Sequence, residues 1–169
     1  MRSLLILGVL IIFVIAGFFV FSSTTKNNPK TLTVPISQAP ETVETKAAFA
    51  IFTHGVFRIF TAAMYHNLST DVYIESSNPN IVYVKRANIT WDDFFNTLPF
   101  KLSKECLTTG TGQTFCTKGN QSLRFYLNGK VNPNALDQVI KEGDQLLVTF
   151  GDNSEAQIQN QLQQVPEIK

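Results

Sequence analysis

The sequence predicts an α+β protein in which a single N-terminal transmembrane helix precedes a mixed β-sheet with one main helix. Three observations lead to this fold class. The chain of 169 residues begins with a long apolar run, it contains several short segments rich in aromatic and β-branched residues, and residues 91–98 carry apolar side chains at helical spacing. The chain that follows the apolar run is long enough for one domain of ordinary size.

The apolar run extends from Leu4 to Phe21 and contains no charged or polar side chain. A helix over this run would be about 27 Å long, close to the ~30 Å hydrocarbon core of a bilayer, whereas the apolar region of a signal peptide has only ~7–15 residues. We therefore expect residues 1–22 to be a membrane anchor, with residues 4–21 in contact with membrane lipid. Cleavage near Ser22 is the alternative, and it would release a secreted domain.

The domain after the anchor is expected outside the cytoplasm. Cys106 and Cys116 lie close together in the sequence, and N-x-[ST] sequons occur at Asn67, Asn88 and Asn120. Disulfides and glycosylation are both compatible with an extracytoplasmic location. Such tripeptides also arise by chance, so the three asparagines are candidate glycosylation sites. The expected arrangement is a single-pass protein of the cell membrane with its C-terminal domain outside.

The composition of residues 47–152 excludes some classes of function. This segment has nine Lys and Arg residues against nine Asp and Glu residues. A balanced charge argues against nucleic-acid binding and against a polybasic membrane-surface role. Ten phenylalanines between Phe49 and Phe150 are enough to supply a hydrophobic core.

Residues 23–46 are predicted to be a linker between the anchor and the domain. The segment is polar, contains Pro29, Pro35 and Pro40, and has no aromatic residue. Such a composition favours a semi-stiff, extended spacer. The alternative is that residues 31–36 add an edge strand to the domain.

The first part of the domain is predicted to be β-structure. Residues 47–60 are dense in aromatic and β-branched residues but are interrupted by Gly55, which indicates one bent strand or two short strands. Residues 61–70 are compatible with a helical turn or a loop. Residues 71–75 and 81–86 flank a segment with Asn and Pro, which is typical of a hairpin.

The main helix is predicted from Trp91 to Leu98. Thr90 is a suitable N-cap, Asp93 can complete a capping box, and Asp92 with Asp93 would lie near the positive end of the helix dipole. The four large apolar side chains of the segment fall on one stripe, which is expected to cover the core. The two aspartates are therefore assigned to helix capping and not to hydrolysis.

The segment from Cys106 to Cys116 is predicted to form a hairpin. This hairpin would bring the two cysteines within the ~5.5 Å between Cα atoms that a disulfide requires. Their spacing, C-x9-C, is neither the C-x-x-C of redox proteins nor a zinc-ligand pair, so a structural bridge is the main interpretation. The Gly and Thr residues at its tip lack the Lys-Ser/Thr of a phosphate loop.

The last part of the domain is predicted to contain a hairpin and a buried strand. Residues 123–127 have the pattern of a strand, and Asn128-Gly129 strongly favours a tight turn. Asp144 is assigned to a turn before residues 145–151, which have the continuous apolar pattern of a central strand. The polar tail, residues 153–169, can add a short helix because Ser154 and Gln157 form a capping-box pattern, although such a helix is marginal alone.

Residues 127–130 (LNGK) and 142–148 (EGDQLLV) resemble the closing strands of β-grasp, or ubiquitin-like, domains of the ThiS-like, SLBB and transcobalamin-C-terminal-like types. More narrowly, the chain resembles small membrane-anchored envelope proteins of archaea and uncultivated bacteria, some of which carry the name of disulfide isomerases. The shared features are Ile89-Thr90 before Phe94-Phe95, the two cysteines, residues 125–130 and Gly143-Asp144. The resemblance covers residues 49–151 and implies a β-grasp-like domain of the cell envelope.

Those relatives tend to carry histidines in H-x-H alternation on their early strands, which suggests metal binding in them. This sequence has only His54 and His66, with Phe52, Tyr83 and Lys85 where further histidines would be expected. Two imidazoles without a neighbouring cysteine are too few for a closed zinc site. We therefore expect no metal and assign both histidines to a turn or a strand end.

The sequence indicates a binding or assembly module without catalytic residues or cofactor, held outside the membrane and with another envelope protein as its expected partner. The alternative is a thiol-disulfide oxidoreductase that uses Cys106 and Cys116. Exchange needs an exposed thiolate, commonly at a helix N-terminus, whereas the predicted helix ends before Cys106.

Overall fold

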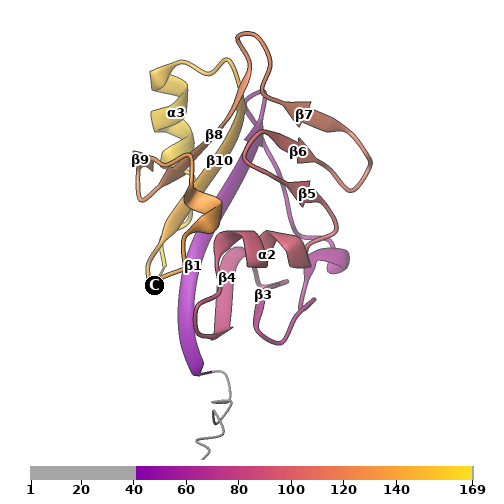
Figure 1. The fold of residues 1–169 in the computed structure, drawn as a ribbon, viewed down its shortest axis with the longest axis vertical. Helices are drawn as coiled ribbons and strands as arrows, with labels where there is room; N and C mark the ends of the chain where they lie inside the picture. Colours follow the sequence, from indigo (N-terminus) through magenta and orange to yellow (C-terminus); the bar gives the residue numbers. More distant parts are fainter. Residues whose placement is uncertain (1–40, 169) are drawn as a thin grey trace, which may run out of the picture. The chain divides into compact units, whose positions relative to one another are not determined.

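The computed structural model describes residues 41–168, which form an α+β fold with a mixed sheet and two α-helices (Figure 1). The predicted anchor at residues 1–22, the alternative cleavage site at Ser22 and residues 23–40 of the predicted linker lie outside the described residues. Within residues 41–168, no helix combines the length and the apolar character needed to cross a membrane.

The main sheet has seven strands in the order β3-β4-β1-β10-β8-β9, and β2 pairs with the end of β1. Central strands β1 and β10 are parallel, with Ala48 opposite Gln145, whereas all other pairs are antiparallel. The sheet is therefore mixed, as predicted. Its strands are β1 (Thr42–Thr53), β2 (Val56–Phe57), β3 (Val72–Glu75), β4 (Asn78–Arg86), β8 (Ser122–Leu127), β9 (Lys130–Val131) and β10 (Gln145–Gly151).

Two layers cover the two faces of this sheet. Figure 1 shows helix α2 (Trp91–Thr97) and a small sheet on one face, and helix α3 (Glu155–Leu162) on the other. The small sheet has the order β5-β6-β7. Its strands are β5 (Lys101–Leu102), β6 (Cys106–Thr108) and β7 (Thr114–Cys116). Short 3-10 helices occur at Ala63–Tyr65 and Ala135–Asp137.

The larger core lies between the sheet and α2. Alternate residues of β1 point to it, and Phe49 is fully buried with its ring centroid 5.3 Å from that of Phe94 and 5.7 Å from that of Phe95. The alternation places Ala48, Ala50 and Phe52 on the opposite face, because successive strand residues point to opposite sides. There they pack with residues of α3 and of the segment after it.

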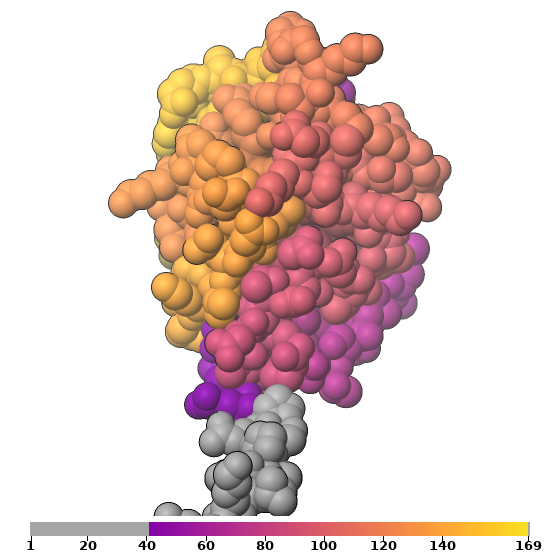
Figure 2. Space-filling model, in the orientation of Figure 1, coloured from indigo at the N-terminus to yellow at the C-terminus, as the bar shows by residue number. Residues whose placement is uncertain are grey.

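Helix α2 confirms the predicted main helix. The Thr90 hydroxyl accepts a hydrogen bond from the Asp93 amide (3.1 Å), and the Asp93 carboxylate accepts one from the Thr90 amide (2.9 Å). This is the expected capping box. The segment of residues 135–140 lies beside α2, with Val139 bridged to Thr90, and the space-filling view shows the two segments in contact (Figure 2).

The short helix predicted in the C-terminal tail is also present. The Ser154 hydroxyl accepts from the Gln157 amide (3.4 Å), and the Gln157 side chain accepts from the Ser154 amide (2.7 Å) at the start of α3. Ile158 and Val165 are buried against the sheet. The short helix is therefore stabilised by packing and does not depend on its intrinsic propensity alone.

The predicted hairpins are present. Strands β3 and β4 pair in antiparallel fashion, as do β8 and β9 around Asn128-Gly129, whose φ angles of 53° and 76° suit a tight hairpin turn. In the β3–β4 hairpin, the turn is shorter than predicted. Strand β4 begins at Asn78, and Pro79 lies where the register shifts, a position at which the missing N–H is tolerated.

The structure also decides between the alternatives that the sequence left open for residues 47–70, a bent strand or two strands and then a helical turn or a loop. The apolar stretch forms two strands, β1 and the two-residue β2, joined at His54-Gly55. Residues 61–70 contain one 3-10 turn, and the rest of that segment is irregular.

One boundary differs from the prediction, because β1 begins at Thr42 and residues 42–46 are not linker. Four of these five residues are polar and three are exposed, so their composition resembles that of the linker before them. Their backbone nevertheless pairs with β4, with Thr45 opposite Val84. The Lys85 ammonium also donates to the Glu44 carboxylate (2.6 Å) across the two strands.

This ion pair predicts a pH effect. The hydrogen bond from Lys85, and then its charge, lower the pKa of the Glu44 carboxyl, while the same hydrogen bond raises the pKa of Lys85. Because the Glu44 pKa is depressed in the folded state, the stabilisation is present above the ordinary carboxyl pKa and is lost as pH falls through the folded value. An NMR titration should find the Glu44 midpoint below normal, and Lys85→Gln should raise it. An unchanged midpoint would contradict the pairing.

Candidate functional site

An open groove of about 450 Å³ lies between the chain that follows β2 and the β6–β7 hairpin. Eight of its 13 lining residues are aromatic or aliphatic, and Arg58 is the one charged residue among them. We call this site the Arg58 groove. Its lining residues are Ile51, Phe57, Arg58, Ile59, Phe60, Met64, Tyr65, Phe100, Leu107, Thr109, Gly110, Thr111 and Gln113.

The first wall of the groove is anchored to the core by Phe60. This side chain is 5% exposed, and its ring centroid lies 5.2 Å from those of Phe49 and Tyr65. His66 donates from Nε2 to the Phe60 carbonyl oxygen (2.8 Å) and so fixes the loop that returns from the 3-10 turn. The position of the wall is therefore determined by packing, although the segment has little regular structure.

The segment that forms this wall exposes apolar side chains. Val56, Ile59, Met64 and Leu68 are 59%, 67%, 54% and 45% exposed. Ile59 and Met64 line the groove, whereas Val56 and Leu68 lie in the same segment outside the lining. The four are among the six large apolar side chains exposed in residues 41–168, and they lie within 13 consecutive positions. A concentration of exposed apolar side chains beside a concavity is typical of an interaction surface.

Arg58 supplies a positive charge to the groove. Its Nε donates to the Thr53 hydroxyl (2.6 Å), and its guanidinium carbon lies 5.4 Å from the centroid of the Phe115 ring. The hydrogen bond and the cation–π contact both orient the guanidinium. Because the groove has no other charged lining residue, this cation determines the sign of the charge it presents.

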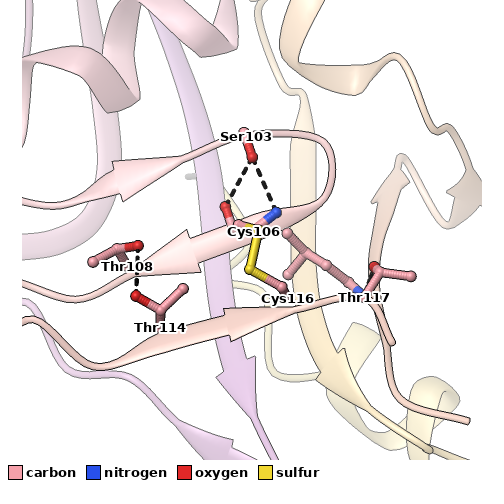
Figure 3. Close-up of a disulfide and its surroundings, with 7 residues drawn as sticks. Ser103, Cys106, Thr108, Thr114, Cys116 and Thr117 are labelled. Atoms are coloured by element: carbon pink, nitrogen blue, oxygen red, sulfur yellow. Dashed lines mark hydrogen bonds between the residues drawn. A yellow bond between two sulfur atoms is a disulfide. The ribbon is translucent and has the colours of Figure 1, made fainter. Parts of the chain in front are cut away.

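The second wall of the groove is the disulfide hairpin, which confirms the predicted Cys106–Cys116 bridge. The two residues face each other across β6 and β7, with 4.1 Å between their Cα atoms. Figure 3 shows the Ser103 hydroxyl bonded to the backbone of Cys106, and a hydrogen bond between the Thr108 and Thr114 hydroxyls (3.0 Å). The same hairpin contributes Leu107 to the groove, so the bridge fixes the strand that carries this wall.

The three candidate glycosylation sites are exposed and separate from one another in the fold. Asn67 follows the 3-10 turn beside the groove, Asn88 precedes α2, and Asn120 lies between β7 and β8. Asn67 and Asn88 have positive φ angles of 53° and 63°, which asparagine adopts more readily than most residues. All three side chains are therefore accessible to solvent.

Local structure accounts for both histidines. His54 occupies the turn between β1 and β2, and its ring makes edge contacts with Phe115 and Phe150 at centroid distances of 5.7 and 5.1 Å. His66 is held by its bond to Phe60. Within residues 41–168, no three His, Cys, Asp or Glu side chains are grouped so as to hold a metal ion.

The aspartates considered in the sequence have distinct structural contacts. Asp93 is part of the α2 capping box, and Asp92 accepts a hydrogen bond from the Asn96 side chain (2.8 Å). Asp144 is 6% exposed and accepts from the Lys141 amide and the Asn128 side chain, both at 2.9 Å. Asp144 therefore joins the turn before β10 to the Asn128-Gly129 turn. The structure does not bring it together with Asp92 and Asp93 in one site.

Sequence reasoning did not identify Arg58 or Met64 as functional residues. It treated residues 56–60 as strand and could not tell which of their apolar side chains face the core. One signal was available, because Val56, Phe57, Ile59 and Phe60 surround Arg58 without the alternation of a half-buried strand. Such a pattern leaves some apolar side chains exposed whichever way the segment turns.

A scan against protein-family models, a search of curated proteins and a search of solved structures each found no match to this chain.

Proposed function

We propose that this protein is a membrane-anchored, extracytoplasmic module that acts by binding and not by catalysis, and that the Arg58 groove is its binding site. The observation that supports this most directly is the groove itself, with an apolar lining and the exposed side chains of Ile59 and Met64. Binding sites for small molecules commonly combine an apolar lining with a few polar groups. The anchor and the location outside the cytoplasm are carried by the apolar run, Leu4 to Phe21, and by the cysteine pair.

We also propose that the domain is β-grasp-like. The strand order β4-β1-β10-β8 supports this, because a parallel central pair made of the first and last strands is flanked by antiparallel neighbours. Helix α2 follows the first hairpin and packs on one face, as expected of that topology. In this scheme, the disulfide hairpin and the segment carrying Arg58 are additions to the basic fold.

The alternative proposal, thiol-disulfide exchange, has less support. Neither cysteine lies at the start of a described helix, since α2 begins at Trp91 and α3 at Glu155. The two cysteines are instead directly opposite each other in a hairpin, which suits a bridge that stabilises structure.

Site-specific photocrosslinking tests the binding proposal. The full-length chain would carry p-benzoylphenylalanine in place of Ile59, at the rim of the groove, or in place of Val131, which is 64% exposed on β9 and does not line it. Irradiation of membranes from cells expressing the protein should give a discrete adduct at Ile59 that is absent at Val131. Thr111→Trp, which replaces a lining residue with a much larger side chain, should abolish this adduct by occupying space in the groove.

Mass spectrometry would identify the adduct as lipid, small molecule or protein. Identical products at the two positions, or an adduct at Ile59 that persists in the Thr111→Trp variant, would contradict binding in the groove. The Val131 variant controls for exposure because its side chain is about as accessible as that of Ile59.

A further inference from the structure

We infer that the Arg58 groove binds a single-chain amphipathic carboxylate of the fatty-acid type, with the carboxylate on Arg58 and the hydrocarbon chain along the apolar lining. This inference rests on the proposed function and specifies the class of ligand. It follows from the charge, the hydrogen-bonding capacity and the size of the groove.

Arg58 has no carboxylate partner among residues 41–168. The three ion pairs formed within residues 41–168 involve Lys85, Arg86 and Lys104, and none involves Arg58. Residues 1–40 contain no Asp or Glu at all. The bond to Thr53 uses one of the five N–H donors of the guanidinium, which is suited to receive both oxygens of a carboxylate. A ligand with an anionic group would therefore complement the groove.

The hydrogen-bonding capacity of the lining favours a hydrocarbon over a peptide. Each residue of a bound peptide brings a backbone N–H and a C=O that need partners. The two threonine side chains of the lining are committed, because the Thr109 and Thr111 hydroxyls bond each other (2.9 Å) and Thr109 also accepts from the backbone N–H of Gln113 (3.2 Å). This leaves the Gln113 side-chain amide and the Tyr65 hydroxyl as the neutral polar groups of the lining that a ligand could use, too few for the backbone of a peptide. A hydrocarbon chain makes no such demand and gains free energy from every methylene group that it buries.

The size of the groove sets the scale of the ligand. A volume of about 450 Å³ lies in the lower part of the range for small-molecule sites, ~300–1,000 Å³. The groove is open, and the exposed side chains of Ile59 and Met64 stand at its rim, where they can cover a chain that lies along it. A carboxylate with a chain of medium length fits this description, and an anion without a tail would leave the apolar lining unused.

Methionine-methyl NMR tests the inference on the full-length chain in phosphatidylcholine nanodiscs. The protein has two methionines, Met1 and Met64, so a sample labelled with 13C-methyl methionine reports on the groove through one resonance. Three probes with the same chain would be titrated, namely decanoate, methyl decanoate and decyltrimethylammonium. Decanoate should shift the Met64 resonance saturably, at a concentration at least tenfold lower than either of the other two.

Three variants test whether the preference for decanoate comes from the charge of Arg58 and not from a change in the fold. Arg58→Gln should abolish the preference for decanoate over its methyl ester, whereas Arg58→Lys should retain part of it because the charge is kept. Lys130→Gln removes the same charge from an exposed position on β9 and should leave the preference unchanged. A folded Arg58→Lys variant keeps the test decisive if Arg58→Gln fails to fold.

Equal responses to the anionic and cationic probes, or no response of Met64 to any probe, would overturn the inference. A protein adduct at Ile59 in the photocrosslinking experiment would overturn it as well, since the groove would then receive a polypeptide. In that case the groove would still be a binding site, but its ligand would not be a fatty acid. The proposed function and this inference can therefore be contradicted independently.

Discussion

Replacing Phe49 with alanine should lower the free energy of unfolding by about 3–5 kcal/mol, the cost typical of a large aromatic side chain removed from a core. Phe49 is fully buried on the central strand β1, and its ring contacts those of Phe60, Phe94 and Phe95. The substitution leaves a cavity where the sheet meets both α2 and the wall of the Arg58 groove. Domain stabilities are typically about 5–15 kcal/mol, so this loss is a large part of the total.

Chemical denaturation followed by tryptophan fluorescence would measure this effect, because Trp91 is the one tryptophan of the chain and is fully buried beside Phe94. Phe57→Ala is the matched control, since the Phe57 side chain is only partly buried and should cost less than half as much. Equal losses for the two variants would contradict the central position of Phe49.

Removing the disulfide with the double substitution Cys106→Ser and Cys116→Ser should cost about 2–3 kcal/mol. The two cysteines are separated by 10 positions, and the chain-entropy estimate for so short a loop falls slightly below the ~3 kcal/mol expected for 15 residues. Leu107 and Phe115, which the hairpin holds in the core at 3% and 6% exposure, should become less well packed. The groove wall would loosen with them.

Thermal unfolding with and without dithiothreitol measures this contribution. Reductant should lower the midpoint of the wild-type protein to that of the double variant and should not change the variant. The control is Thr108→Val with Thr114→Val, which removes the neighbouring cross-strand hydrogen bond and should cost less than about 1 kcal/mol. A wild-type midpoint that does not respond to complete reduction would show that the bridge contributes nothing.

The features that sequence predicts well in this protein are those with short-range causes. The capping box of Thr90 and Asp93, the turn at Asn128-Gly129 and the pairing of Cys106 with Cys116 all depend on residues at most ten positions apart. Each has a chemical signal that does not require knowledge of the rest of the fold. These elements were predicted at the positions where the structure places them.

Features that depend on distant contacts were predicted less completely. The polar residues at the start of β1 form a strand only because β4 offers its edge, so composition assigned them to the linker. A mixed sheet was predicted, but its parallel pair, β1 with β10, joins opposite ends of the domain and has no local signal that identifies the two strands. The Arg58 groove has the same kind of origin, because its two walls come from segments separated by α2 and cannot be brought together by any local pattern.

The parallel contact between β1 and β10 has a consequence for the order of events during biosynthesis. Ala48 cannot meet Gln145 until almost the whole domain has been translated, and contacts between such remote positions slow folding because a long loop must close first. Until then, one side of β1 lacks its neighbour and its apolar residues stay accessible. A released chain truncated before Gln145 would therefore be a substrate for chaperones and proteases, whereas one that extends past Gly151 can complete the sheet.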